Sequence, residues 1–255
     1  MTRAVAATVS ERRSESQSVP CFELDHWHAE LGVSAGITGR EGEFDLGLKG
    51  NSPAGAVMSR WGALVDSMRP RFRGLVVGIQ HHGKLVGVHL QPHEGMLVQE
   101  GLDGHATVVR GLLLVVLVAD CIPVYLVDRV SRAVALLHAG WRGTAAGILE
   151  TGVEQLCRAA GARPENLLMH CGVGICGSCY EVGPEVVRGV SGRAVDGPRK
   201  LDLRLDLAER AERVGIRDVT RSNWCTAHDA EMFYSHRALG GKEGRMAAYL
   251  GVPLT

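Results

Sequence analysis

The chain has 255 residues, enough to bury a full hydrophobic core in one large domain or two small ones. Its 28 basic residues balance its 28 acidic residues, and a net charge of zero gives no sign of a nucleic-acid-binding or anionic-membrane-binding surface. The longest apolar run covers residues 112–119, far fewer than the ~20 residues that a membrane-spanning helix needs. We therefore expect neither nucleic acid nor a membrane as a partner.

The first 20 residues contain no continuous apolar segment of the kind found in secretory signals. Their content of Ser, Glu and Arg predicts a disordered tail over residues 1–20, and a single domain is then expected over residues 21–255. The seven cysteines are an odd number, and in the absence of an export signal they favour reduced thiols or metal ligands over disulfides. This cysteine usage predicts a cytoplasmic location.

Hydrophobic periodicity predicts alternating helices and strands in the rest of the chain. The expected helices cover residues 54–68, 144–160 and 205–214. The expected strands cover residues 74–79, 106–109, 112–119, 133–137, 167–171 and 219–223. Because helices and strands alternate without a recognisable linker, we expect one α/β domain.

Three of the expected strands are followed by residues that bind transition metals, namely His82, Cys121 and His138. Sites in α/β sheets form where strands end and loops begin, so side chains that are far apart in sequence converge there. Two imidazoles and one thiolate leave one position of a tetrahedral ion open, which is typical of catalytic zinc. The spacing is too long for a zinc finger. The simpler alternative is a buried thiol and two histidines hydrogen-bonded to the backbone.

Arg142 lies in a glycine-flanked turn just before the expected helix start at Thr144. Free N–H groups at a helix start attract anions, and the planar guanidinium matches the geometry of phosphate. The turn therefore indicates a phosphate site, although a surface arginine at a turn is the common alternative. Asp120, beside Cys121, is a candidate general base, a group that orients a ligand, or an ordinary strand-end cap.

His236 and Arg237 lie in the segment FYSHR and form another pair of an imidazole and a cation. Such a pair after a short aromatic segment suits contact with a substrate. We assign catalytic roles to Asp120 and Arg142, and substrate binding to Arg142, His236 and Arg237. The remaining histidines are interpreted as surface or core residues.

Cys171, Cys176 and Cys179 form a C-x₄-C-x₂-C pattern, with Cys225 further along the chain. This spacing is similar to plant-type iron–sulfur ligation, and Cys176 with Cys179 matches a redox pair. Cys225 is distant, however, and no thioredoxin-type βαβ unit lies nearby. We favour the simpler interpretation that these small residues pack a tight glycine loop.

Several motifs occur in the same order as in the bacterial laccase-domain family, which the chain resembles over about residues 21–252. They are QHHG (80–83), DGHAT (103–107), ADCIPV (119–124), HAGWRGT (138–144), ICGSCYEVG (175–183), WCT (224–226) and FYSHR with a later GR (233–245). The combination of HAGWRG with ADCxPV is the most specific part. Family members are labelled either polyphenol oxidases or purine nucleoside phosphorylases.

This resemblance implies packed mixed sheets flanked by helices, in a laccase-domain or cysteine-hydrolase-like fold. By motif position it implies that His82, Cys121 and His138 are zinc ligands. The implied activity is phosphorolysis of adenosine, inosine and methylthioadenosine to a purine base and a sugar 1-phosphate, accompanied by deamination of adenosine. The expected partners are thus nucleoside and phosphate, and the expected assembly is a monomer or small homo-oligomer.

Three alternatives stay open at this point. Copper also accepts His and Cys, as the polyphenol oxidase label suggests, but multicopper oxidases use repeated H-x-H motifs and the eleven histidines here show no such repetition. Without a metal, Cys121 becomes a thiolate nucleophile with His138 as its base, as in a cysteine hydrolase. A non-catalytic binding protein is the third, and the many reactive groups at loop positions argue against it.

Overall fold

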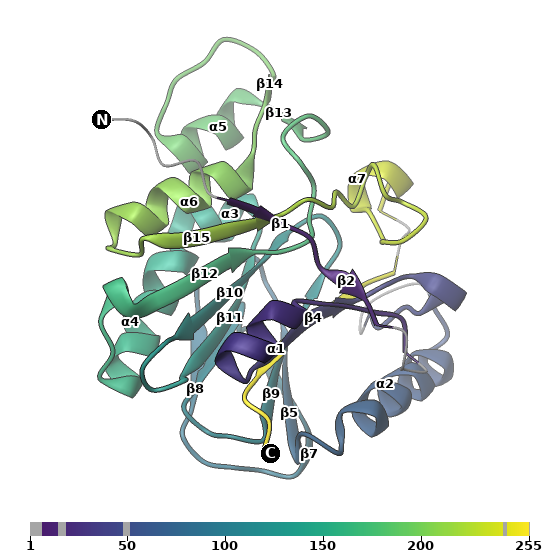
Figure 1. Cartoon of the computed structure of the whole chain (residues 1–255). Coiled ribbons are helices and arrows are strands. Elements are labelled where there is room, and N and C mark those ends of the chain that lie inside the picture. The colour runs from purple at the N-terminus through teal and green to yellow at the C-terminus, as the bar shows by residue number, and fades with distance from the viewer. Residues whose placement is uncertain (1–6, 15–18, 48–51, 242–243, 255) are drawn as a thin grey trace.

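Two seven-stranded mixed sheets packed face to face form the centre of the molecule (Figure 1), as predicted. The computed structural model describes residues 7–14, 19–47, 52–241 and 244–254. The first sheet has the order β1 (Ala7–Val9), β15 (Asp218–Ser222), β12 (Leu167–Cys171), β10 (Ile122–Asp128), β11 (Val134–Ala139), β8 (Gly104–Thr107) and β6 (Val86–His89). The second has the order β2 (Arg12–Arg13), β3 (Cys21–Glu23), β4 (Ser34–Thr38), β16 (Met246–Gly251), β9 (Leu112–Val118), β5 (Gly74–Ile79) and β7 (Gly95–Glu100).

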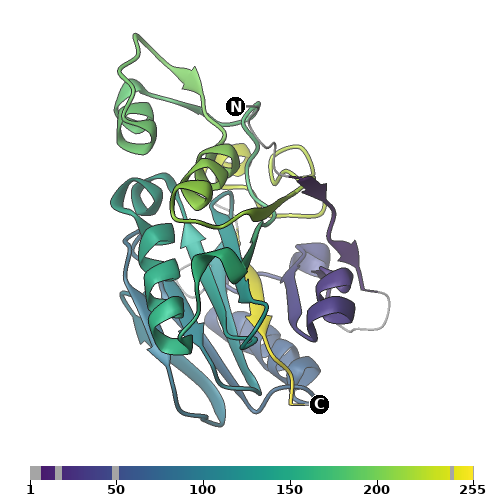
Figure 2. The same ribbon diagram turned by 60° about the vertical axis from the view of Figure 1, so that its left-hand side comes forward.

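Seven helices in the described part of the chain flank the sheets, namely α1 (Asp25–Leu31), α2 (Ala54–Met68), α3 (Trp141–Ala146), α4 (Ile148–Ala160), α5 (Pro184–Ser191), α6 (Leu203–Arg213) and α7 (His236–Leu239). Helix α2 covers the outer face of one sheet and α4 and α6 that of the other, whereas Trp27 of α1 packs into the core between the sheets (Figure 2). Two 3₁₀ turns (Glu41–Glu43 and Pro164–Asn166) and a small hairpin of β13 (Glu181–Val182) and β14 (Arg199–Lys200) complete the described elements. No helix in the described part of the chain is long and apolar enough to cross a membrane.

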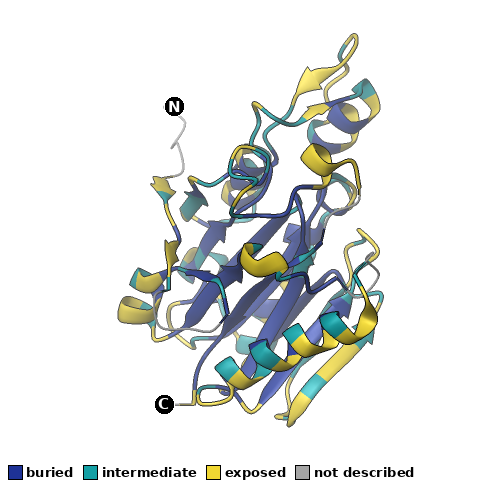
Figure 3. Ribbon diagram, turned by 90° about the vertical axis from the view of Figure 1, so that its right-hand side faces the viewer, coloured by how far each residue is buried: buried dark blue, intermediate teal, exposed yellow. Residues whose placement is uncertain are grey.

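The apolar strand β9 contributes side chains to two hydrophobic cores, one on each of its faces. Alternate side chains of a strand point to opposite faces. Leu114 and Val116 therefore pack between the two sheets, while Leu113 and Val115 pack under α2. All four are fully buried, and each contributes about 1.5–3 kcal/mol of hydrophobic stabilisation. Figure 3 shows the central strands as buried and the outer sides of the helices as exposed. This burial makes β9 a rigid support for the loop at its carboxyl end.

The predicted helix over residues 144–160 is wrong in its start and its continuity. Helix α3 already begins at Trp141, so Arg142 lies inside its first turn and not ahead of it. The helix stops at Gly147, whose φ of 90° is a left-handed conformation that favours glycine, and α4 starts directly afterwards. The strand β10 (Ile122–Asp128) was absent from the predicted elements, because its central position in a sheet buries both faces and removes the alternating pattern.

Within the expected tail, the described residues form two short strands. Ala7–Val9 pairs in parallel with β15, and Arg12–Arg13 pairs with β3. Between them, the Glu11 carboxylate is only 2% exposed. It accepts hydrogen bonds from the His170 ring at 3.0 Å and from the Ser222 hydroxyl at 2.6 Å. Polar partners in the core thus order a segment with few apolar residues. Residues 1–6 and 15–18 lie outside the described residues.

Replacing Glu11 with Ala tests this anchor. The change leaves buried partners at His170 and Ser222 without their acceptor, so we expect the free energy of unfolding to fall by about 3–5 kcal/mol. Urea denaturation followed by circular dichroism measures it. The control is Glu154→Ala, which removes an exposed ion pair with Arg158 and should cost less than about 1 kcal/mol. Equal losses in the two variants would contradict the anchor.

Candidate active site

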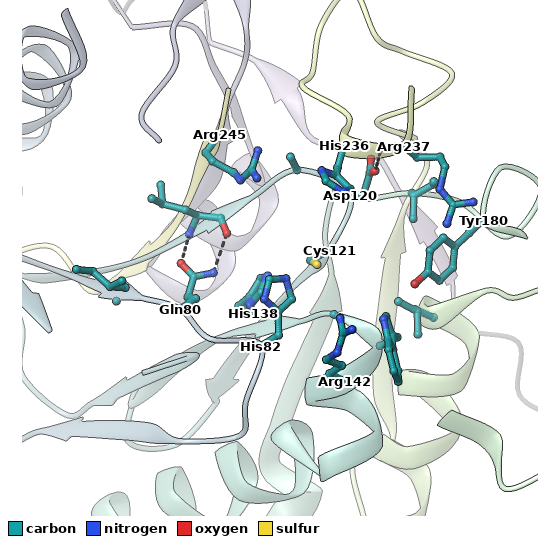
Figure 4. Close-up of a pocket in the computed structure, with 18 residues that line it drawn as sticks. Gln80, His82, Asp120, Cys121, His138, Arg142, Tyr180, His236, Arg237 and Arg245 are labelled. Carbon is teal, nitrogen blue, oxygen red and sulfur yellow. Dashed lines mark hydrogen bonds between the residues drawn. The ribbon is translucent and has the colours of Figure 1, made fainter. Parts of the chain in front are cut away.

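The structure brings together the three metal-ligand candidates that the sequence predicts. His82 follows β5, Cys121 lies in the turn after β9, and His138 is near the end of β11. Their ligand atoms all lie within 4.8 Å of one another. The rings of His82 and His138 meet edge to face with centroids 4.8 Å apart, and the Cys121 sulfur lies beside them (Figure 4). His138 is buried, Cys121 is half-buried and His82 is exposed, so the group opens on one side only.

Asp103, which sequence reasoning missed, holds two of these residues in place. Its carboxylate is completely buried and accepts the Nδ1–H of His138 at 2.9 Å. It also accepts the backbone N–H groups of His81, His82 and Gly83, at 2.7 to 3.1 Å. The bond to Nδ1 leaves the Nε2 lone pair of His138 available to a metal, as in many carboxylate–histidine–metal arrangements. The only sequence signal was an Asp-Gly pair at the expected turn before a strand.

The loop residue His82 has a left-handed backbone, with φ of 58°. This conformation is uncommon for a residue with a Cβ and persists only where neighbouring contacts fix it. The three N–H groups bound by Asp103 supply those contacts and aim the imidazole at Cys121. His81 takes the opposite direction, with its ring 3.8 Å from the Glu100 carboxylate and outside the cavity lining.

Charges within the group favour a Cys121 thiolate beside a protonated His138, whose Nε2 proton a binding metal ion would displace. Burial raises the pKa of Cys121, but the charge of His138 and the hydrogen bonds from both histidines lower it to about 6. Burial lowers the pKa of His138, but Cys121 and Asp103 together raise it to about 9. The Asp103 pKa is lowered despite the opposing effect of burial, chiefly through its hydrogen bond with His138. Cys121 is accordingly a thiolate at neutral pH, which is the form that binds metal ions.

Gly140 makes room for the three ligands. A Cβ at this position would lie 2.9 Å from the Cys121 sulfur and 3.1 Å from Cδ2 of His82. Only a residue without a side chain lets the start of α3 approach the ligands this closely. The two imidazoles, the thiolate and this glycine therefore form a cradle that fits one divalent ion with an open coordination position.

The open side faces a cavity of about 540 Å³, within the usual range for small-molecule sites. One part of its lining is apolar or aromatic, and another part is cationic. The lining residues are Gly78, Ile79, Gln80, His82, Leu117, Ala119, Asp120, Cys121, His138, Gly140, Trp141, Arg142, Ile175, Tyr180, Leu203, His236, Arg237 and Arg245. All seven predicted site residues are among them, and Tyr180 and Arg245 are additions from the structure.

Four cationic or imidazole groups surround the space in front of the ligands (Figure 4). The Arg142 guanidinium stacks on the Trp141 ring with its Cζ 4.4 Å from the centroid, and it forms no ion pair within the described part of the chain. Arg237 stacks on Tyr180 at 5.2 Å and donates to the Glu181 carbonyl. A cavity lined by several such groups is suited to an anion.

Asp120 lies at the cavity wall with its carboxylate fully engaged. One oxygen accepts the Thr226 hydroxyl at 2.5 Å and the other accepts the Arg237 backbone N–H at 2.6 Å. Its φ of 82° places Asp120 in the left-handed region beside Cys121. These bonds tie the turn of Cys121 to the segment of Arg237, so this geometry favours a positioning role for Asp120 over that of a general base.

Comparison with known proteins now adds to the geometry. The family model described as multi-copper polyphenol oxidoreductase laccase matches residues 28–253. The chain belongs to this family. The resemblance inferred from the laccase-domain motifs is thereby confirmed.

Curated relatives of this laccase-family chain carry names from nucleoside metabolism. A purine nucleoside phosphorylase of Deinococcus radiodurans is 37% identical over 158 residues, which are 59% of this chain and 61% of that protein. Adenosine deaminase RL5, from an unknown prokaryotic organism, is 35% identical over 161 residues, or 57% and 60% of the two chains. The match thus spans about three fifths of each relative. The solved structure of YlmD from Geobacillus stearothermophilus has the same fold, with a TM-score of 0.84 over 94% of this chain and 98% of that one, at 24% identity.

A pair of glycine substitutions tests the cradle. In Gly140→Ala the new Cβ crowds Cys121 and His82, so we expect metal affinity to fall by about 10–100-fold, the usual effect of disturbing the surroundings of metal ligands. Competition with a chromophoric chelator measures this affinity. The control is Gly189→Ala in α5, where the nearest atom is an ordinary 3.6 Å away and affinity should not change. A Gly140→Ala protein with wild-type affinity would exclude this arrangement of ligands.

Proposed function

We propose that the chain is a zinc-dependent purine nucleoside phosphorylase that also deaminates adenosine. The observation that carries this proposal is the placement of an incomplete metal-ligand set and a group of cationic side chains on the same cavity. Phosphorolysis needs a bound phosphate, and deamination needs an activated water. The relatives' names support this class of reaction.

His82, Cys121 and His138 would hold the metal. A set of two imidazoles and one thiolate with an open position suits Zn²⁺, which binds a Cys₂His set in some catalytic sites and three protein ligands in most. When bound, such an ion supplies Lewis acidity and lowers the pKa of water toward neutrality. The protein itself contributes the dry, shaped cavity and the Asp103 bond that orients His138.

Arg142 is the proposed main phosphate ligand. Its guanidinium lies over the Trp141 ring at the cavity wall, which limits its conformations before phosphate binds. His236, Arg237 and Arg245 line the same cavity and would hold the phosphate and the sugar hydroxyls. Opposing the charge of phosphate with fixed cations keeps it close to the anomeric carbon, where the glycosidic bond breaks.

The apolar part of the lining would hold the purine. Leu117, Ile175 and Leu203 offer apolar surface to a base, and Tyr180 adds an aromatic face. Gln80 is not available to the base, because its amide pairs with both the N–H and the C=O of Leu117, at 2.8 and 2.7 Å. It therefore fixes the loop before His82 to β9. The cytoplasmic location and the monomeric or small oligomeric state stay predictions.

A copper-dependent polyphenol oxidase is the second candidate, because the family description names copper and laccase activity. Copper accepts the same ligand types. The described residues provide one further Cys- and His-containing group besides the candidate active site, and that group is rich in thiolates. Elemental analysis of protein purified without chelator decides the metal. Stoichiometric copper together with oxygen uptake on a phenol would replace the zinc proposal.

The direct test is to incubate metal-loaded protein with adenosine. With phosphate we expect adenine and ribose 1-phosphate, and without phosphate we expect inosine as the main product, both measured by liquid chromatography. Removing the metal with a chelator and a desalting step should abolish product, and added Zn²⁺ should restore it. If metal-loaded protein gives no product in either buffer, the proposal is wrong. Product formation that survives metal removal but is blocked by alkylation of Cys121 would instead indicate a cysteine hydrolase.

Replacing Arg142 with Ala separates the two reactions. We expect kcat/KM for phosphate to fall by about 100-fold, because a charge-assisted contact to phosphate is lost. Deamination does not use phosphate and should change by less than about threefold. Arg158→Ala, which removes an exposed guanidinium on α4, is the matched control and should leave both rates at wild-type values. Equal loss of both reactions in Arg142→Ala would assign this residue to nucleoside binding and not to phosphate.

A further inference from the structure

Four side chains beside the cavity form a second group of metal-ligand type. They are Cys176, Cys179, Cys225 and His228, and their ligand atoms all lie within 4.8 Å of one another. The His228 ring lies between two of the thiols, with Nε2 3.3 Å from Cys179 Sγ and Nδ1 3.6 Å from Cys176 Sγ. Two ligand atoms of one tetrahedral zinc ion lie ~3.3–3.8 Å apart. The two nitrogen–sulfur distances are therefore close to those between ligand atoms of a single zinc ion.

The spacing within the group matches that of zinc sites. The first two ligands read C-x₂-C (176–179) and the last two read C-x₂-H (225–228), so the pattern is one pair of short turns. Both turns are closed by backbone hydrogen bonds. The N–H of Cys179 donates to the Cys176 carbonyl at 3.1 Å, and the N–H of Asp229 donates to the Cys225 carbonyl at 2.8 Å. Each turn thus points its two ligand atoms the same way.

Two of the sulfurs have polar groups of the protein within hydrogen-bond distance. The backbone N–H of Cys176 donates to the sulfur of Cys225 at 3.3 Å. The Ser178 hydroxyl lies 2.9 Å from the sulfur of Cys176. Bonds of this kind to ligand atoms orient them and balance their charge in metal sites. The Asp229 carboxylate accepts the N–H of Cys225 at 2.9 Å and so braces the second turn.

We propose that Cys176, Cys179, Cys225 and His228 bind a structural Zn²⁺ ion, separate from the ion at the candidate active site. Three thiolates and one imidazole complete a tetrahedral shell, which leaves no position for water or substrate and is typical of a structural site. A soft, sulfur-rich tetrahedral set selects zinc over magnesium, calcium or manganese. This proposal does not depend on the proposed enzymatic function.

The geometry replaces the earlier interpretations of these cysteines. Cys171, the first member of the iron–sulfur pattern, lies in β12 inside the core under α4 and α6 and is fully buried. It is therefore not a ligand of this group. A redox pair would use Cys176 and Cys179 alone, yet Cys225 and His228 converge on the same point. Ordinary packing of a glycine loop does not require four ligand-type groups to meet.

The proposed ion joins two segments that both reach the cavity. On the first segment Ile175 precedes Cys176 and Tyr180 follows Cys179, and both of these neighbours line the cavity. On the second, Thr226 follows Cys225 and donates to Asp120, next to the active-site ligand Cys121. A bridge from 176–179 to 225–228 therefore fixes one wall of the substrate site without touching the substrate.

Metal content of matched variants tests the site. Cys179→Ser should hold one zinc per chain less than the wild type when both are measured by mass spectrometry of protein purified without chelator. Cys121→Ser should lose a different zinc, so the double variant should lose both. Cys157→Ser is the control, because this half-buried thiol on α4 belongs to neither group and its loss should leave the zinc content unchanged. Amide hydrogen exchange should rise at 172–182 and 224–230 in Cys179→Ser and stay at the wild-type level in Cys157→Ser.

Cobalt reconstitution gives a second readout that does not require a folded Cys179→Ser protein. Charge-transfer absorption in the near ultraviolet grows with the number of thiolates on Co²⁺, and the two groups offer three thiolates and one thiolate. Cobalt-loaded Cys121→Ser should therefore keep about three quarters of the wild-type absorption. Near-complete loss of the absorption in this variant would overturn the second site. An unchanged zinc content in Cys179→Ser, a Cys176–Cys179 disulfide, or stoichiometric iron with acid-labile sulfide would also overturn it.

Discussion

The buried carboxylate of Asp103 is the contact on which the candidate active site depends. It binds the imidazole of His138 and three backbone N–H groups around His82, so one acidic side chain sets two of three ligands. A buried carboxylate without such partners would be costly in free energy, whereas this one accepts four hydrogen bonds. The left-handed backbone of His82 is held by the same bonds. Ligand orientation and local folding are therefore parts of one interaction.

The packing of the two sheets brings the third ligand to this point. Cys121 follows β9 in one sheet, while His138 belongs to β11 in the other, and the side chains between the sheets form one continuous core. The hydroxyl of Tyr125 on β10 donates to the carbonyl of Gly36 on β4 at 2.8 Å, which is a direct hydrogen bond across that core. Because packed cores resist sliding, the distance between the ligands is set by the sheets and not by the loops. Metal binding then needs little rearrangement of the chain.

Much of the site was predictable from the sequence, because soft ligands at strand ends are local features. The positions of His82, Cys121 and His138 could be read from where apolar runs stop. The role of Asp103 could not be predicted in this way, because it depends on β8 lying beside β11, a long-range pairing that no local pattern records. The prediction of a continuous helix through Gly147 was wrong for a related reason. A glycine in a helical pattern is compatible with a continuous helix, and the pattern does not record the left-handed φ of 90° that Gly147 adopts.

The same contrast accounts for the proposed open site and the proposed closed site lying side by side. The active-site ligands are carried by strand ends, where sheet hydrogen bonds and a shared core already fix the backbone. The segments 176–179 and 225–228 have few such supports, and they are 49 residues apart when measured from Cys176 to Cys225. A cross-link closing a loop of that length restricts the unfolded chain by about 4 kcal/mol in the simple entropic account. A fully ligated ion at the proposed second site would therefore fix this wall of the cavity, as the sheets fix the strand ends that carry His82, Cys121 and His138, and would leave the chemistry to the proposed ion with a free position.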